Sequence, residues 1–294
     1  MTPQAFTELV LGAVLLAGLY ATMSYGLALI YGVMKIINLA HAGILMLSAY
    51  LAYWLYVTFK LNPFLAPLIV VPVFFLFGML MQRVLIRPIA NAAPIASLLL
   101  LFGSWLIMQN VAYLIFSGDT RSLPPDFTLP AINLSGVHLS TNRLIIFSVG
   151  VTALIILQLF LTRSSTGRAI RAVSADGEAA SLVGVNTPRI SMIAFGLGIA
   201  LAALAGSLMA LIFTFDPDFG RSHMLKSFCI VVMGGLESFV GIALGSLVLA
   251  LAEALSITVG GVPAALQDFV SFALLVIVLL VMPNGLLSLL KRET

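Results

Sequence analysis

Two carboxylates in the apolar C-terminal third of the chain, Glu237 and Glu253, are the first candidates for chemistry. An ionised side chain at the centre of a bilayer costs about 2.5–3.5 kcal/mol on insertion scales, so Glu253 should face protein or water. Such an acid either carries protons for a transporter or is a buried structural acid that is hydrogen-bonded to a neighbouring helix. Gly234 and Gly235 favour a helix break beside Glu237, which would place that carboxylate at a lumen or an interface.

A polar segment between two apolar runs holds Asn38 and His41, and Gly43 follows it. Either these two side chains cap a helix end at the membrane interface, or the segment is unwound and exposes its backbone to a water-filled path for a polar solute. His41 alone does not make a metal site, because His138 and His223 lie in other loops and no second ligand stands nearby.

Motifs for enzymatic catalysis are missing from the sequence. It has no GxxxxGK[ST] phosphate loop, so this chain does not bind ATP by that device, and it has no HExxH, GxSxG or paired-cysteine motif. Its single cysteine, Cys229, cannot form an internal disulfide. Residues 216–226, which include acids at 216 and 218, look like an external turn. We therefore predict no catalytic residue, no metal and no cofactor in this chain.

Composition indicates which elements position these groups. Of the 294 residues, 61% are hydrophobic and 9% are charged, and the mean hydropathy is +1.16. These values exclude an ordinary soluble domain, and also a disordered chain, which needs low hydrophobicity and high net charge. A formal net charge of +3 is too small a surplus for a protein that binds nucleic acid. The sequence therefore predicts an integral membrane protein.

Apolar runs between charged residues predict an all-α, polytopic membrane helix bundle that forms one domain over residues 1–294. A helix needs about 20 residues to cross a hydrocarbon layer of about 30 Å. Eight to ten segments are expected, some of them broken or re-entrant. The predicted spans lie at residues 9–34, 36–59 and 61–82, around Ser104 and Trp105, at 144–162 and at 190–215, with two or three more in 225–290.

Lysine and arginine in short loops set the orientation of such a bundle. Basic residues gather at 83–87, in 163–189 and in the C-terminal tail, and we expect all three regions in the cytoplasm. Residues 118–143 then form an external loop, and the start of the chain lies outside too. Three unbroken helices fit most easily into 190–290, whereas a cytoplasmic tail needs an even number of crossings. A broken segment around residues 234–235 would repair this parity.

The loop at 163–189 combines regular charge with small residues. Ser164 to Thr166 can cap a short helix from about Gly167 to Ser174, and Asp176 can cap a second helix that ends at Gly184. Two short helices along a membrane face would offer a rigid, partly basic surface. Either the loop is solvated and its arginines only fix topology, or it is a docking site for a cytoplasmic partner, because a mere connector could be far shorter.

At these places the sequence resembles the inner-membrane permease subunits of branched-chain amino acid ABC transporters, specifically the smaller of the two paired permeases. The resemblance runs over nearly the whole chain, and the 163–189 loop is its strongest part. The sequence departs from the family pattern at Ala42, where glycine is usual, and at Glu237, where a small residue is usual. The matching residues are Ile37 to His41, Gly167 to Ala172 with Asp176, Ala180, Gly184 and Val185, then Phe195, Ala202 to Gly206, Gly234 to Leu236, Gly241 and Gly245.

The resemblance implies a multi-pass permease in a bacterial inner membrane, surrounded by lipid and paired with a second, homologous permease. Two cytoplasmic ABC ATPases, which hold ATP and Mg, and a periplasmic solute-binding protein would complete an importer for branched-chain or similar amino acids. The resemblance also implies two groups of site residues. Gly167, Arg168, Arg171, Asp176, Glu178 and Gly184 would seat the loop on the ATPase, and Asn38, His41, Gly43, Gly234 and Gly235 would lie on or near the solute pathway.

Two other functions compete with the importer permease. In an ion-coupled secondary transporter, Glu237 or Glu253 would couple a small polar solute to protons or sodium, and inverted repeats would support that function. In a membrane-embedded transferase for lipid-linked substrates, the acids at 216–218 would be the catalysts.

Overall fold

The computed structural model describes residues 2–90, 92–123, 129–134, 136–235, 238–263 and 266–281, which are predominantly helical. Glu237 and the basic tail with Lys291 and Arg292 lie outside the described residues. Seven helices in the described part of the chain are long and apolar enough to cross a membrane. They are α1 (Pro3–Met34), α2 (His41–Phe59), α3 (Pro67–Met81, continued by η1, Gln82–Ile86, and η2, Arg87–Ile89), α4 (Pro94–Phe116), α5 (Thr141–Arg163), α8 (Thr187–Met209) and α10 (Phe239–Thr258).

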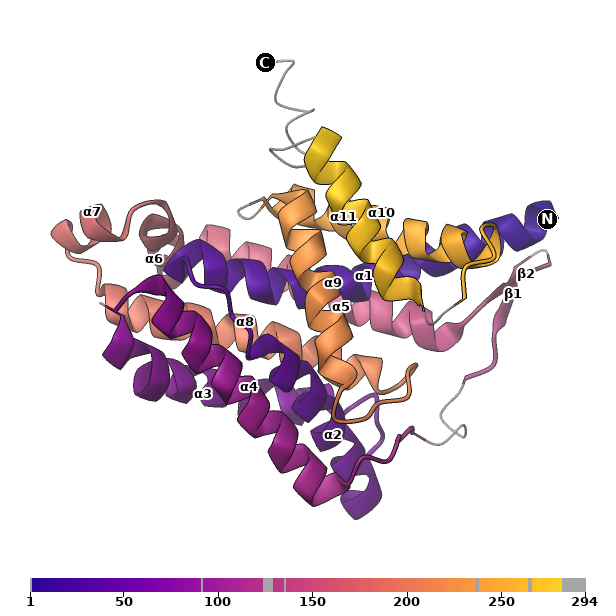
Figure 1. Ribbon diagram of the computed structural model, residues 1–294, viewed down its shortest axis with the longest axis horizontal. Helices are drawn as coiled ribbons and strands as arrows, with labels where there is room; N and C mark the ends of the chain where they lie inside the picture. Colours follow the sequence, from indigo (N-terminus) through magenta and orange to yellow (C-terminus); the bar gives the residue numbers. More distant parts are fainter. Residues whose placement is uncertain are drawn as a thin grey trace.

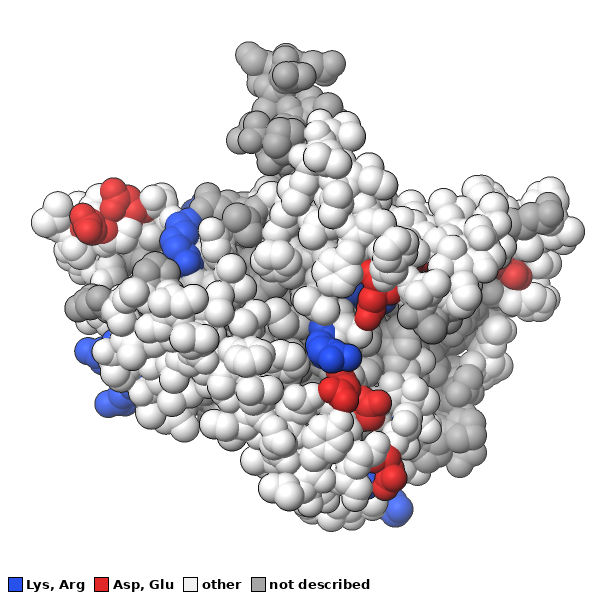
Figure 2. Space-filling model, viewed as in Figure 1, with Lys and Arg blue, Asp and Glu red and all other residues white. Residues whose placement is uncertain are grey.

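Two shorter helices, α9 (Phe219–Gly234) and α11 (Gln267–Val281), pack against α10 and against each other. Both cross α1 at a steep angle in Figure 1. Counted with the seven long helices, they confirm the predicted all-α polytopic bundle in which some segments are short. The surface agrees with this fold, because charged residues are sparse on the face drawn in Figure 2.

Helices α1 and α8 form the centre of the bundle, and most of their residues are buried. Glycines let their backbones touch: a Cβ on Gly26 would lie 2.5 Å from the carbonyl oxygen of Gly198, and a Cβ on Gly198 would lie 2.6 Å from that of Gly26. The row of small residues in α8 therefore marks close helix packing. Helices α4 and α5 lie at the periphery, where leucine and isoleucine side chains such as Leu114 and Ile156 are exposed as a lipid-facing surface requires.

The two polar loops lie at opposite ends of the molecule (Figure 1). At one end, β1 (Ile132–Leu134) pairs antiparallel with β2 (Val137–Leu139) beside the start of α1, where the His138 N–H donates to Glu8 Oε1 at 2.6 Å. At the other end, two short helices, α6 (Ser165–Ala175) and α7 (Gly177–Leu182), follow α5. The described parts of 118–143 thus lie at the opposite end of the bundle from 163–189, and which of the two ends faces the cytoplasm stays a prediction.

Helices α9 and α10 form a hairpin that turns within the bundle. Helix α9 starts beside the end of α4, where the Tyr113 hydroxyl donates to Asp218 Oδ2 at 2.7 Å. At the turn, Phe239 packs on Tyr25, well before the end of α1, with ring centroids 4.3 Å apart. Thr258, at the end of α10, lines the same cavity as Glu8, which is near the start of α1. The hairpin therefore enters and leaves from one end of the bundle, which supplies the break that the parity argument predicts.

Two sequence predictions near residue 215 are wrong. Helix α8 ends at Met209 instead of continuing to residue 215, because the chain turns and the backbone of Phe215 pairs with that of Arg121. Residues 219–226 are helical instead of part of an external turn. Helix α9 begins at Phe219 because Gly220 is small enough to pack on the backbone of Ala42 in α2, a tertiary contact that local sequence does not show.

Candidate functional site

The two short helices α6 and α7 are capped by the residues that the sequence indicates. Ser164 Oγ accepts from the Gly167 N–H at 2.8 Å and so caps α6. Asp176 Oδ1 accepts from the N–H groups of Glu178 and Ala179, both at 2.9 Å, and caps α7. Gly184 follows α7 with φ +86°, a conformation that favours glycine. The predicted pair of helices is confirmed.

Helix α6 is held rigidly on three of the long helices. A Cβ on Gly167 would lie 2.5 Å from the Cα of Leu161 in α5, so only glycine fits this crossing. Ser174 Oγ donates to the carbonyl oxygen of Gly32 in α1 at 2.9 Å. Ile170 and Val173 are buried in a small core that also includes Ile190 and Ala194 of α8. A displacement of α6 would therefore be transmitted to α1, α5 and α8 together.

The opposite face of α6 and α7 is open. Arg168 and Glu178 are exposed there, while Arg171 is exposed but also lines a cavity on the bundle side. Leu182 and Val183 are exposed as well, with exposed fractions of 88% and 81%. Sequence reasoning missed this apolar pair. The available signal was that two large apolar residues follow directly after Ala180 and Ser181, while α7, capped by Asp176, is too short to bury them on the same side as Ala180.

A cavity of about 280 Å³ separates α6 from the turn of the α9–α10 hairpin. Arg171 and Ser174 of α6 lie on one side of it, and Ser238 and Phe239 lie on the other. Gly234 ends α9, and Gly235 takes φ +92°, which explains the paired glycines at this turn. The helix break predicted at Gly234 and Gly235 thus lies within the bundle, across this cavity from α6.

Asn38 lies in the non-helical segment between α1 and α2, and His41 is the first residue of α2. Both side chains are completely buried. Neither the amide atoms of Asn38 nor the ring nitrogens of His41 have a hydrogen-bond partner within standard geometry, although the backbone of Met23 lies near His41. Ser24 Oγ is also buried without a partner. Buried polar groups are normally hydrogen-bonded to protein or to ordered water. The side chains of Asn38 and His41 are therefore enclosed beside a non-helical segment and do not cap a helix end at an exposed interface.

The predicted pathway residues fall into two separate groups. Gly43, in α2, packs on Met108 of α4, where a Cβ would come within 2.6 Å of the Met108 Cε. Gly220 contacts Ala42, so the group around His41 adjoins the start of α9. Gly234 lies at the other end of that helix, about 21 Å away at 1.5 Å per residue. The structure does not bring the two groups together, and their place on a pathway stays a prediction.

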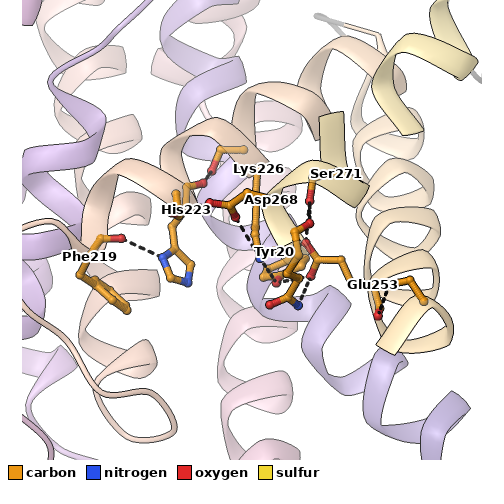
Figure 3. Close-up of polar contacts among 11 residues, drawn as sticks. Tyr20, Phe219, His223, Lys226, Glu253, Asp268 and Ser271 are labelled. Atoms are coloured by element: carbon orange, nitrogen blue, oxygen red, sulfur yellow. Dashed lines mark hydrogen bonds and ion pairs between the residues drawn. The ribbon is translucent and has the colours of Figure 1, made fainter. Parts of the chain in front are cut away.

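Glu253 lies in a buried polar network that joins four helices (Figure 3). Its Oε1 is 2.9 Å from Lys226 Nζ in α9 and accepts from the Ser271 hydroxyl of α11 at 2.8 Å. Its Oε2 accepts from the Tyr20 hydroxyl of α1 at 2.7 Å and from Gln267 Nε2 at 2.9 Å. The carboxylate is thus paired with four donors, which is the arrangement expected of a buried structural acid.

Sequence reasoning missed Lys226, the cation of this network. The signal was present, because a lysine in a helix packed inside a membrane bundle needs an acidic or carbonyl partner there. Asp268 is its second partner, with Oδ1 at 3.9 Å from Nζ and a side chain that is 44% exposed. The network lies beside a cavity of about 550 Å³, which Arg143 and His223 also line.

Comparison with known proteins gives the same family that the sequence resembles, and it does so along nearly the whole chain. Residues 9–279 match the family model of the permease component of branched-chain amino acid transport systems. The chain is 32% identical to the high-affinity branched-chain amino acid transport system permease protein LivH of Salmonella typhimurium, over 96% of each chain. It is also 32% identical to the corresponding protein BraD of Pseudomonas aeruginosa, over 92% of this chain and 91% of BraD.

A likeness to a solved structure supports the fold alone. PsaBC from Streptococcus pneumoniae, solved in complex with a Fab, superposes with a TM-score of 0.50 at 14% identity, over 95% of this chain and 94% of the other. The arrangement of helices therefore recurs in a protein of very different sequence.

Proposed function

Because this chain belongs to the permease family of branched-chain amino acid transport systems, we propose a transport cycle in which its short helices α6 and α7 receive the driving force. As a member of that family, it is a permease subunit of an ATP-binding-cassette importer and a multi-pass membrane protein. Its solute is a branched-chain or similar amino acid, an assignment that the names of the relatives support.

The complete importer has further subunits. A second, homologous permease forms the other half of the pathway, and a periplasmic binding protein delivers the solute. Two cytoplasmic ATPases hold ATP and Mg, since this chain has no phosphate loop of its own. The permease lies in a bacterial inner membrane, with α6 and α7 in the cytoplasm and residues 118–143 in the periplasm, an orientation that the positive-inside rule supports.

The observation that carries this proposal is the attachment of α6. One face of α6 is fixed to α1, α5 and α8, while the other face, with α7, is open to a partner. When ATP closes the ATPase pair, the push on α6 displaces these helices as a rigid body. The cavity between α6 and the α9–α10 turn gives the hairpin room to respond. Leu182 and Val183 add an apolar contact to the charged residues at the ATPase surface.

Reversing the charge of Arg168 and Arg171 tests the docking surface. In the purified importer, R168E/R171E should lower solute-stimulated ATPase activity and uptake by about tenfold, because the inverted charges would no longer complement the proposed ATPase surface. The permease itself should keep its thermal stability, since both side chains are exposed. The matched control R168K/R171K retains the charges and should stay close to the parent. ATPase binding that is unchanged in the reversed variant would contradict the docking role.

Reconstitution tests the function as a whole. In proteoliposomes, the chain and its partner permease should take up leucine only when the ATPases, ATP and the binding protein are all present. An ionophore should leave that uptake intact. Uptake by this single polypeptide, or uptake that an ionophore abolishes while ATP is present, would instead assign an ion-coupled secondary transporter.

A further inference from the structure

A polar cavity of about 550 Å³ lies between the end of α3 and the start of α8, away from the cavity at the hairpin turn. Three arginines line it: Arg83 in η1, Arg87 in η2 and Arg189 in α8. Ser181 of α7, Asn186 and Thr187 add polar groups. The cavity therefore offers a concentration of hydrogen-bond donors where residues 82–87 meet residues 181–192.

Its charge is uncompensated within the described part of the chain. Among the described residues, the ion pairs are those of Lys226 with Glu253 and Asp268. No described acidic side chain is paired with any of the three arginines. Arg83 and Arg87 are four residues apart, in consecutive helical elements, and both line the cavity. The start of α8 adds the partial positive charge of a helix N-terminus. A bound anion would neutralise the positive charge of the three arginines and of this helix N-terminus.

Apolar side chains on α3 and on η1, which continues it, indicate where the cavity lies relative to the membrane. Leu80 and Val84, which flank Arg83 in sequence, are 58% and 56% exposed. The preceding α3 is among the helices that can cross a membrane. The arginines thus stand where an apolar outer surface gives way to charge, which is the level of lipid headgroups.

We propose that this cavity binds a phosphate group, supplied by the headgroup of an anionic membrane phospholipid or by soluble phosphate. Guanidinium groups bind phosphate oxygens through paired, charge-assisted hydrogen bonds. A bound phosphate would join η1 and η2 to α7 and α8, and so would brace the segment that carries Ser181. The three arginines are exposed, and arginines that only fix topology would have no common ligand. The site does not depend on the identity of the transported solute.

Binding to the purified importer tests the site. Its affinity is measured for dihexanoyl-phosphatidylglycerol, for the zwitterionic dihexanoyl-phosphatidylcholine and for inorganic phosphate, in the parent and in R83Q/R87Q/R189Q. The triple variant should bind phosphatidylglycerol at least about tenfold more weakly, because charge-assisted bonds are lost. The control R163Q removes an exposed arginine at the end of α5, outside the cavity, and should bind like the parent.

The outcomes separate the sources. Binding of phosphatidylglycerol without inorganic phosphate identifies a lipid site, and binding of inorganic phosphate identifies a soluble anion, provided that the triple variant loses either one. The single variant R87Q, with its melting temperature recorded, serves if the triple variant does not fold. Equal binding by the parent and the arginine variants overturns the proposal. So does a loss of ATPase subunits from the triple variant with unchanged ligand binding, which would assign the arginines to the ATPase interface.

Discussion

Replacing Glu253 with leucine is expected to destabilise the protein by about 3–5 kcal/mol, the loss typical of breaking a buried ion pair from one side. The change leaves the ammonium group of Lys226 without the carboxylate that is 2.9 Å away, and the Lys226 side chain is only 7% exposed. It also leaves the Tyr20 hydroxyl without the acceptor that it has at 2.7 Å. The measurement is denaturation of the purified permease in detergent, followed by helix content and by thermal midpoint.

A graded series makes this prediction specific. Lys226→Met should cost less than Glu253→Leu, because the carboxylate keeps three hydrogen-bond donors when the ammonium group is removed. Asp268→Asn should cost at most about 1 kcal/mol, since Asp268 is partly exposed and lies 3.9 Å from Lys226. If Glu253→Leu is as stable as Asp268→Asn, the network does not hold α9, α10 and α11 on α1.

Local patterns were sufficient to predict most of the long helices and the two short helices of the 163–189 loop. The spacing of charged residues located the membrane segments, because burying an unpaired charge in hydrocarbon is costly. The side chains of Ser164 and Asp176 act within three residues of their own position, so α6 and α7 could be read from the sequence. The glycines at 234 and 235 marked the end of α9 for the same reason, since their effect on the backbone is local.

Long-range contacts were beyond the same patterns. Glu253 could be identified as a buried acid, but its pairing with Lys226 depends on how α9 folds back against α10. The start of α9 at Phe219 depends on the contact of Gly220 with Ala42, far away in the chain. The enclosed positions of Asn38 and His41 depend on packing around α1 and α2. The sequence therefore named candidate residues without showing which of them meet.

Replacing Gly241 with alanine is expected to disrupt the α9–α10 hairpin and to reduce uptake by at least about tenfold. A Cβ at Gly241 would overlap the carbonyl oxygen of Gly234, and it would lie 2.8 Å from that residue's carbonyl carbon. A backbone group cannot rotate away as a side chain can, so α9 and α10 would have to move apart. Overpacking of this kind costs about 1–3 kcal/mol, and Ser238, which caps α10 at this point, would move as well.

Gly103→Ala is the matched control for this experiment. Gly103 is also inside a helix, α4, but a Cβ there meets no atom within 4 Å, so the change should gain up to about 1 kcal/mol from helix propensity. Both variants add one methyl group to a helical glycine, and they differ only in what that methyl group touches. If Gly241→Ala transports as well as Gly103→Ala, close contact of α9 with α10 is not needed for transport. The proposal that the hairpin responds to a push on α6 would then be contradicted.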